Sequence, residues 1–435
     1  YGTIGSSVAA GKYVYLWGAQ LNVGSRVLDY TPTTSAAVYG PRFDHDPVTK
    51  ESLGLLIEEQ RTNLLTYSQD FSNASWTYKS SVSVTPASSV SPEGIQTAQL
   101  LLATATGQPY IYRTLTVSNS TSYTQTVYAK ASGKGYFYFF DINNAHNNVW
   151  FNLNAGTIST PTVGTASITP VGNGWYRCTQ TTTSSSTLGY FGIGLSDSSG
   201  STSCTADNVN GILFWGAQLE QGSFATSYIP TTSTQVTRAA DSASMTGTNF
   251  SSWYRQDEGT TYEESSIPAT TTSAAMTVVS LDNGLAHGYR IQKSTSSAAL
   301  VELTGTTSGT LGTIIANTPA KAAVAYYDTG IAGSLNGATV VSATAAYPTA
   351  PTQMLIGKDY SGNPLSGTIK RISYWPKRLP NAQLQVLTSP APFIGSSWNE
   401  SADSYSILGS NGNYLSTVMP CLVTPGNEGA GDIIL

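Results

Sequence analysis

Residues 212–233, ILFWGAQLEQGSFATSYIPTTS, have a second copy near the start of the chain, where residues 16–35 read LWGAQLNVGSRVLDYTPTTS. Trp17 aligns with Trp215 at an offset of 198 residues (215 − 17), and the alignment continues without a gap to the final Tyr-x-Pro-Thr-Thr-Ser. This period is far too long for a solenoid and matches the length of a whole domain. We therefore interpret the copies as the same closing strand and exit turn, used by two related domains.

The first copy has only a few residues in front of it. We expect residues 1–38 to be the closing strand of a truncated or upstream β domain, with the strand itself over residues 12–20. If this interpretation is right, Trp17 and Trp215 occupy equivalent positions in their sheets.

The composition indicates a folded all-β chain. Charged residues make up only 10% of the 435 residues, well below the roughly 25% of ordinary soluble domains. Ser, Thr, Asn and Gly take their place, and aromatics reach 10%, with 26 Tyr and 8 Trp. Disordered chains have few aromatics and a high net charge, so this chain is of the opposite kind. At this length we expect two or three domains with a hydroxyl-rich, extracellular type of surface.

Charge, hydropathy and cysteine usage exclude several classes of function. A net charge of −5 argues against nucleic acid as the main partner, because phosphate binding requires clustered Lys and Arg. No apolar run reaches the length of a membrane-spanning helix, so we expect no membrane insertion. A bridge between Cys178 and Cys204 is possible, but we expect both to be small apolar strand residues. The three histidines lie far apart, and no structural zinc site is expected.

Residues 39–62 are the most charged part of the chain and contain Gly-Pro and Asp-Pro turn signals. We interpret them as a connector between domains, with one brief strand over residues 53–57. Glu58 and Glu59 could suggest a catalytic carboxylate pair. Adjacent side chains on a strand point to opposite faces, however, and Arg61 is close enough to pair with one of them. A structural role is the better interpretation.

Residues 63–235 are predicted to form one domain, in which short strands alternate with turn signals and helical periodicity is absent. About ten strands without helices between them indicate a two-sheet sandwich of the jelly-roll type. Asn173-Gly174 marks a hairpin, since a type I′ turn needs positive φ at both central residues. The predicted strands are 81–86, 97–103, 110–117, 123–131, 136–142, 149–152, 166–171, 175–182, 188–195 and 211–219.

The strand that begins at Tyr136 reads YFYFF and is aromatic at every position. Alternate side chains of a strand face opposite sides of the sheet. One set, for example Phe137 and Phe139, should fill the core between the sheets. The other set, which includes Tyr138, should then lie on an outer face, where tyrosine rings can stack on sugars and their hydroxyls can hydrogen-bond.

A loop dense in amide and carboxylate groups follows this strand, and such groups recognise sugar hydroxyls. We therefore predict a carbohydrate-binding site here. The alternative is that the extra aromatics pack against a neighbouring domain or subunit. The candidate residues are Tyr136, Tyr138, Asp141, Asn143, Asn144, His146 and Asn147.

Residues 236–388 are predicted to form a second β-sandwich. A short helix is expected over residues 382–388, with Asn381 as its N-cap. Residues 389–435 show little periodicity and are expected to form an irregular tail. The predicted strands of this sandwich are 259–264, 275–280, 288–293, 298–303, 321–328, 338–342, 353–358 and 367–375.

Six motifs occur together in an order that resembles one group of proteins. They are residues 54–65 (GLLIEEQRTNLL), 70–76 (DFSNASW), 172–177 (GNGWYR), 215–220 (WGAQLE), 228–232 (YIPTT) and 237–241 (TRAAD). These motifs resemble signatures of tailed-bacteriophage fibre and minor structural proteins. The middle domain is similar to jelly-roll carbohydrate-binding modules, and residues 236–388 are similar to concanavalin A-like (laminin-G-like) sandwiches. The resemblance covers residues 41–388 and leaves both ends unmatched.

This resemblance implies a trimeric fibre on the exterior of a virion, used for host recognition or for decoration. It carries over no catalytic residue, because the motifs are folding landmarks. Such families often hold calcium in the lectin-like sandwich. Asp282, Asn283, Asp328 and Asp359 could supply ligands, but no spacing here fixes a site, so no cofactor is predicted.

We therefore expect a non-enzymatic phage structural protein, a tail fibre or spike, that binds host cell-surface glycan. Its expected partners are copies of itself in a homotrimer, other virion proteins and the glycan. The alternative is a purely architectural head or neck decoration fibre without glycan binding. A polysaccharide depolymerase is less favoured, since glycosidases need two carboxylates about 5–10 Å apart and the acidic residues here are few and dispersed.

Overall fold

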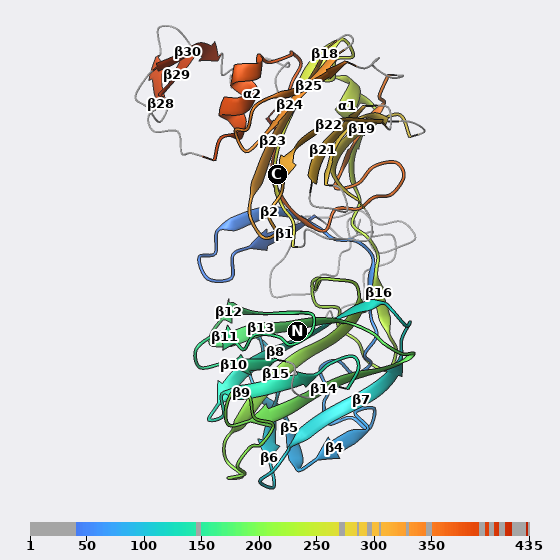
Figure 1. Ribbon diagram of the computed structural model, residues 1–435, viewed down its shortest axis with the longest axis vertical. Coiled ribbons are helices and arrows are strands. Elements are labelled where there is room, and N and C mark those ends of the chain that lie inside the picture. The colour runs from blue at the N-terminus through green and yellow to red at the C-terminus, as the bar shows by residue number, and fades with distance from the viewer. Residues whose placement is uncertain are drawn as a thin grey trace, which may run out of the picture. The chain divides into compact units, whose positions relative to one another are not determined.

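The chain divides into two compact units, Tyr1–Arg42 and Phe43–Leu435. The computed structural model describes residues 41–144, 149–268, 275–284, 287–293, 298–303, 306–327, 330–344, 350–390, 396–399, 404–408, 414–419 and 432–433. The expected strand over residues 12–20 and the position of Trp17 lie outside them and stay predictions. In the described residues strands dominate, which confirms the all-β fold class (Figure 1).

The strands between residues 78 and 221 form two six-stranded antiparallel sheets, in agreement with the predicted sandwich class. Sheet I has the strand order β11-β10-β9-β14-β7-β4, and sheet II has the order β12-β13-β8-β15-β6-β5. The strands are β4 (Tyr78–Ser80), β5 (Val82–Ser89), β6 (Ala98–Ala103), β7 (Tyr110–Thr116), β8 (Ser122–Ser132), β9 (Tyr136–Phe140), β10 (Trp150–Asn152), β11 (Thr157–Ile158), β12 (Thr165–Gly172), β13 (Trp175–Thr183), β14 (Leu188–Ser196) and β15 (Gly211–Gln221).

Apolar alternation along these strands builds the core of the jelly roll. Phe137 and Phe139 of β9 are fully buried between the sheets. Phe137 packs edge-on against Phe214 of sheet II, with 5.2 Å between ring centroids. Cys178 and Cys204 are buried free thiols, which confirms their interpretation as small apolar residues.

The repeated motif lies on the closing strand β15 and the turn that leaves it. Trp215 packs against Tyr228, thirteen residues later (228 − 215), with 4.6 Å between ring centroids. Gly216 sits at a β-bulge with a φ of 65°, where glycine is favoured. Gln218 Oε1 then accepts a hydrogen bond of 2.7 Å from the backbone N–H of Ile229. The strand and its exit turn are therefore held together by Trp, Gly, Gln and Tyr, which occur at the same positions in both copies.

The hairpin between β12 and β13 has the turn that its sequence predicts. Asn173 has a φ of 52° and Gly174 a φ of 76°. Positive φ at both central residues is the signature of a type I′ turn.

Residues 236–388 form the second sandwich together with part of the preceding segment. One sheet has the order β1-β2-β27-β18-β23-β24-β25, with β31 paired to β27, and the other has the order β17-β26-β19-β20-β21-β22. The strands are β1 (Arg42–His45), β2 (Ser52–Ile57), β17 (Ala243–Thr246), β18 (Glu258–Ser266), β19 (Met276–Asp282), β20 (His287–Lys293), β21 (Ala298–Leu303), β22 (Thr306–Thr313), β23 (Ala320–Tyr327), β24 (Gly330–Leu335), β25 (Val341–Thr344), β26 (Gln353–Ile356) and β27 (Gly367–Trp375).

Residues 39–62 therefore do more than connect two domains. The strand expected over residues 53–57 is present as β2, and it pairs with β27 of the second sandwich. A further strand, β3 (Arg61–Asn63), pairs with β16 (Val236–Arg238) in a separate two-stranded sheet. Leu55 and Ile57 of β2 are buried in the core of the second sandwich.

The predicted helix is present as α2 (Asn381–Thr388), which buries Leu384 against one sheet face of the second sandwich. Its N-cap is Pro380, so the prediction of Asn381 as N-cap is wrong. The Asn381 side chain instead accepts a hydrogen bond from the guanidinium of Arg378. A second helix, α1 (Thr248–Ser251), spans a single turn.

Residues 389–435 are not irregular throughout, in contrast to the prediction. They contain a three-stranded antiparallel sheet of β28 (Ser396–Asn399), β29 (Ser404–Leu408) and β30 (Tyr414–Met419). The short strand β31 (Asp432–Ile433) pairs with β27 of the second sandwich.

Candidate functional site

The side chains of β9 alternate between the two faces of sheet I as predicted, but two of them are not exposed. Tyr138 and Phe140 lie opposite to Phe137 and Phe139, outside the main core. Both are nevertheless fully buried, with 0% of their surface exposed. The prediction that Tyr138 contacts a ligand directly is therefore corrected: its ring supports other rings.

Two glycines on the neighbouring strand explain this burial. Gly192 is registered with Phe140 and Gly194 with Tyr138. A Cβ at Gly194 would lie 2.1 Å from Cζ of Tyr138, so the ring occupies the space that any side chain would need. Tyr112 approaches from the other side of β14, with 5.2 Å between its ring and that of Phe140. The rings of Tyr138, Phe140 and Tyr112 thus cover the two glycines of β14.

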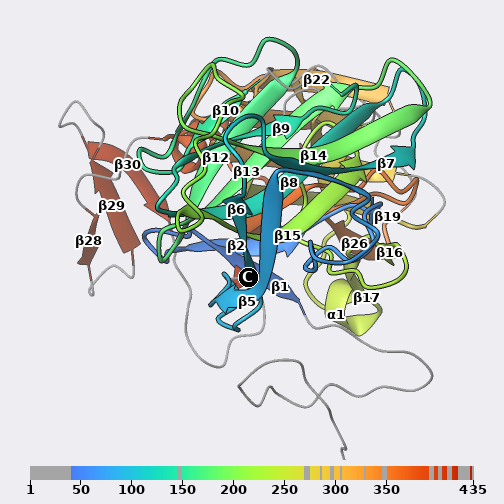
Figure 2. The same cartoon turned by 90° about the horizontal axis from the view of Figure 1, so that it is seen from below.

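Beside these buried rings, on the same face of sheet I, lie four tyrosines, Tyr78, Tyr110, Tyr112 and Tyr190, which we call the tyrosine platform. They come from β4, β7 and β14, and Figure 2 shows β7 and β14 beside β9 and β10. Tyr78 and Tyr112 stack with 4.5 Å between ring centroids and 13° between ring planes. Tyr110 and Tyr190 lie 5.7 and 6.0 Å from the Tyr112 ring.

The platform is open to solvent at one end. Tyr78 is 46% exposed, and the other three tyrosines are half-buried. One face of the Tyr78 ring is occupied by Tyr112, and β4 is the edge strand of sheet I. Tyr78 is therefore the most exposed ring of the platform.

The phenol groups of the platform influence one another. Desolvation raises the pKa of Tyr112, and Tyr78, Tyr110 and Tyr190 raise it further. Burial also raises the pKa of Tyr138, to about 12. The hydroxyls of Tyr112 and Tyr138 therefore stay protonated at neutral pH, and a phenol can both donate and accept hydrogen bonds.

The loop after β9 has a structural role where it is described. Asp141 is buried, and its Oδ1 accepts a hydrogen bond of 2.9 Å from the backbone N–H of Asn143. The Asn143 side chain binds the Thr183 carbonyl (2.9 Å) and accepts hydrogen bonds from Ser185. The Asp141 side chain is thus occupied within the loop, whereas the partly exposed Asn143 side chain joins the loop to the turn after β13.

The remaining predicted site residues are dispersed. Asn144 is exposed, with a φ of 67°. Tyr136 is half-buried, and its hydroxyl accepts a hydrogen bond of 2.9 Å from Nδ2 of Asn152. His146 and Asn147 lie outside the described residues.

The sequence interpretation missed the four tyrosines of the platform. A signal was present, because Tyr110 and Tyr112 alternate on a predicted strand as Tyr136 and Tyr138 do. Tyr78 gave no such signal, since its strand has only three residues.

The acidic cluster of residues 58–61 is held in ion pairs, and the predicted pairing of Arg61 with one of its two carboxylates is confirmed. Arg61 pairs with Glu59, and Arg238 pairs with Glu58 at 3.0 Å. Burial raises the pKa of Glu59, opposed by the charge of Arg61.

Two carboxylates suggested as calcium ligands occupy separate hydrogen-bond networks. Asp282 accepts hydrogen bonds from Gln353 (2.7 Å) and Ser280 (3.0 Å). Asp359 forms an ion pair with Arg290. Asp328 lies outside the described residues. In the part of the chain that the structure describes, no three His, Cys, Asp or Glu side chains gather as metal ligands.

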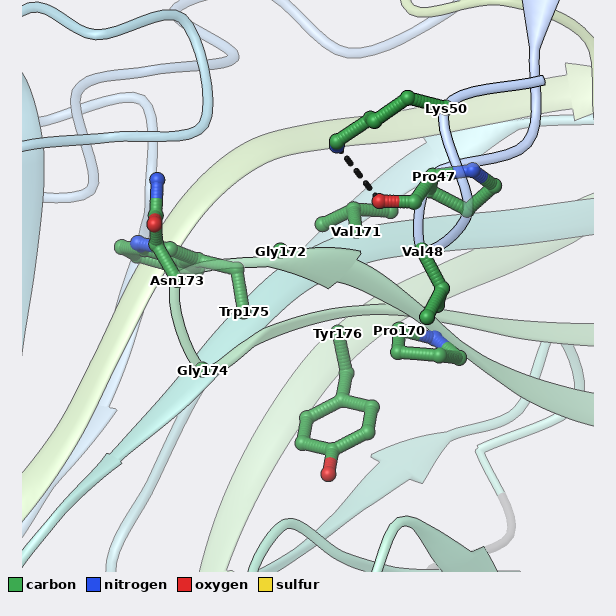
Figure 3. Close-up of a pocket in the computed structure, with 10 residues that line it drawn as sticks. All are labelled: Pro47, Val48, Lys50, Pro170, Val171, Gly172, Asn173, Gly174, Trp175 and Tyr176. Carbon is green, nitrogen blue, oxygen red and sulfur yellow. Dashed lines mark hydrogen bonds between the residues drawn. The ribbon is translucent and has the colours of Figure 1, made fainter.

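A pocket between the turn after β1 and the β12–β13 hairpin offers little chemistry (Figure 3). It is lined by Pro47, Val48, Lys50 and residues 170–176. Lys50 Nζ donates a hydrogen bond of 2.6 Å to the Pro47 carbonyl, so the ammonium group is used within the turn.

Over the described residues, no helix is both long and apolar enough to cross a membrane.

Comparisons with known proteins show only partial likeness. No protein-family model matches the chain, and no curated protein matches it in sequence. The carbohydrate-binding module CBM40 of the Ruminococcus gnavus IT-sialidase, bound to α2,3-sialyllactose, is similar at 14% identity and a TM-score of 0.27, over 31% of this chain and 83% of that one. A Trypanosoma rangeli sialidase is similar at 9% identity and a TM-score of 0.27, over 32% of this chain and 23% of that one. These scores transfer no residue role to this chain, and the all-β fold rests on the strands described above.

Proposed function

We propose that this protein binds glycan through the tyrosine platform, as a non-enzymatic structural component of a phage virion. One observation carries the glycan-binding part: four partly exposed tyrosines lie together on an outer sheet face, beside the buried rings of Tyr138 and Phe140. Packing of Tyr110 and Tyr112 against these buried rings holds the platform in position before any ligand arrives.

The chemistry of these side chains suits a sugar. A tyrosine offers a large apolar ring face and a hydroxyl at its end, and it loses little conformational entropy when it is held in place. The C–H groups of a pyranose can pack on the ring face while its hydroxyls bind the phenols. Tyr78, the most exposed ring of the platform, is the ring that we expect to stack on the sugar.

The virion part of the proposal is supported by the ordered motifs. The motif at residues 215–220 and the motif at residues 228–232 join in one strand-and-turn lock through the Trp215–Tyr228 contact. Such a lock suits a chain built of modules in series. Under this proposal the protein stands on the exterior of the virion, as a homotrimer of tail fibre or spike subunits.

The non-enzymatic part is supported by how the jelly roll uses its acids. Asp197 pairs with Lys134 at 2.7 Å, and Asp207 accepts hydrogen bonds from the backbone of Asn210 and Val209. These hydrogen bonds lower the pKa of both carboxyls to about 2. A general acid needs a raised pKa, so neither group fits that role. Release of reducing sugars from host polysaccharide would overturn this part.

The glycan-binding proposal is tested by replacing Tyr78 with alanine. An aromatic contact contributes about 0.5–1.5 kcal/mol beyond its buried area, so we expect Tyr78→Ala to weaken binding to host polysaccharide by roughly threefold to tenfold. The readouts are a glycan array and biolayer interferometry with purified polysaccharide. Tyr327→Ala is a matched control, because Tyr327 is also 46% exposed but belongs to the second sandwich.

Two outcomes would contradict the proposal. If the wild-type protein binds no host polysaccharide, the chain has an architectural role instead. If Tyr78→Ala and Tyr112→Ala both bind like the wild type, the glycan site lies elsewhere in the molecule.

A further inference from the structure

Sheet I is almost free of charge. Its six strands contain only two charged residues, Lys79 on β4 and Arg113 on β7. Both belong to strands that carry platform tyrosines. Whether the platform bears a positive charge from these strands therefore depends on which face of the sheet the two side chains occupy.

Both cations point away from the platform. Lys79 is registered with Ile111 and Arg113 with Phe191, and these two apolar partners are fully buried in the core. Lys79 Nζ donates a hydrogen bond of 3.0 Å to the Ser72 carbonyl. Arg113 Nη1 donates to the carbonyl and hydroxyl of Thr66, both at 3.0 Å. Both cations therefore hydrogen-bond to groups away from the platform face.

The outward positions of the strands are uncharged. In register across sheet I, one row contains Tyr78, Tyr112, Gly192 and Phe140. The next row contains Ser80, Tyr110, Gly194, Tyr138 and Trp150. A carboxylate placed here would lose water without gaining a positive partner, and burial of an unpaired charge is costly. Phenols can donate to a carboxylate, but they supply no positive charge.

We infer that the tyrosine platform selects neutral glycans and discriminates against glycans that carry carboxylate or sulfate groups. This inference rests on the proposed function and adds the ligand class to it. Selection arises from the placement of Lys79 and Arg113 on the inner face, so the outward positions of the described strands of sheet I offer ring faces and uncharged polar groups to a ligand.

The test compares neutral oligosaccharides on an array with their sialylated or uronic-acid counterparts. We expect the wild-type protein to prefer the neutral member of each pair by at least roughly tenfold. Binding to the neutral member should change by less than about twofold between 0.05 and 0.5 M NaCl, because salt screens only charge interactions. Equal or tighter binding of the acidic members, lost in Tyr78→Ala, would overturn the inference while glycan binding by the platform stands.

A designed charge gives the complementary measurement. Ser80 lies on the platform face beside Tyr110, so Ser80→Arg should gain binding to the acidic members, and salt should weaken that gain. Lys79→Ala is the matched control on the opposite face of the same strand and should keep the wild-type selectivity. If Ser80→Arg gains nothing for acidic members, or Lys79→Ala shifts the selectivity, the inference fails. If no glycan of either class binds the wild type, the proposed function itself fails.

Discussion

Glu263 is a carboxyl group in the core of the second sandwich. It lies on β18 between Ala322 and Ile372, both fully buried. Its Oε2 has no hydrogen-bond partner among the described residues. Burial raises the pKa of Glu263 to about 8, although a hydrogen bond from Ser265 opposes the shift.

The raised pKa predicts that acid stabilises this sandwich. The unfolded chain releases the Glu263 proton near its ordinary pKa of 4.5, whereas the folded chain keeps it up to about pH 8. The contribution is therefore complete below pH 4.5 and is lost as the pH rises through 8. A shift of this size corresponds to a contribution of about 5 kcal/mol to the free energy of unfolding.

Replacement by glutamine should remove this dependence. We expect Glu263→Gln to unfold like the wild type at pH 4 and at higher temperature than the wild type at pH 9, measured by calorimetry. Glu264→Gln is the control, because Glu264 follows on the opposite side of the same strand and is only partly buried. An unchanged pH profile in Glu263→Gln would show that another group controls the stability.

At the scale of the strand, β14 is built to receive aromatic rings. Its inward residues Phe191, Ile193 and Leu195 are fully buried, while its outward positions include Gly192 and Gly194. We predict that Gly194→Ala forces the Tyr138 ring to move, which costs about 1–3 kcal/mol of stability and weakens glycan binding. Gly94→Ala should leave glycan binding unchanged, since a Cβ there meets nothing within 4 Å. Wild-type binding by Gly194→Ala would show that the platform does not depend on the position of the Tyr138 ring.

Alternation and turn chemistry predicted the strands of the jelly roll closely, because those signals are local. The strand expected over residues 175–182 is observed as β13 (Trp175–Thr183), and the Asn173-Gly174 turn has the expected positive φ values. The candidate site was harder to predict, because the burial of Tyr138 depends on Gly194, which is 56 residues later (194 − 138). Tyr78 was missed because three residues are too few to show alternation.

At the scale of the whole molecule, the repeat has gained a physical explanation. The Trp215–Tyr228 contact, the bulge at Gly216 and the Gln218 hydrogen bond each require one residue type that the first copy also has. The offset of thirteen residues from Trp215 to Tyr228 (228 − 215) lets the exit turn fold back so that these two rings touch. Repetition of such a joint suits a fibre made of successive β modules.

Under the proposed function the protein is a trimer with one platform per chain, which leads to the last prediction. One platform of ring contacts binds a sugar weakly, but linked sites can raise the overall affinity by about 10²–10⁴-fold. We expect sedimentation velocity to give a trimer, and interferometry to show much slower dissociation from densely than from sparsely coated polysaccharide surfaces. Tyr78→Ala should remain trimeric and lose most of the density effect. A monomer, or equal dissociation rates on both surfaces, would mean that each chain binds its glycan alone.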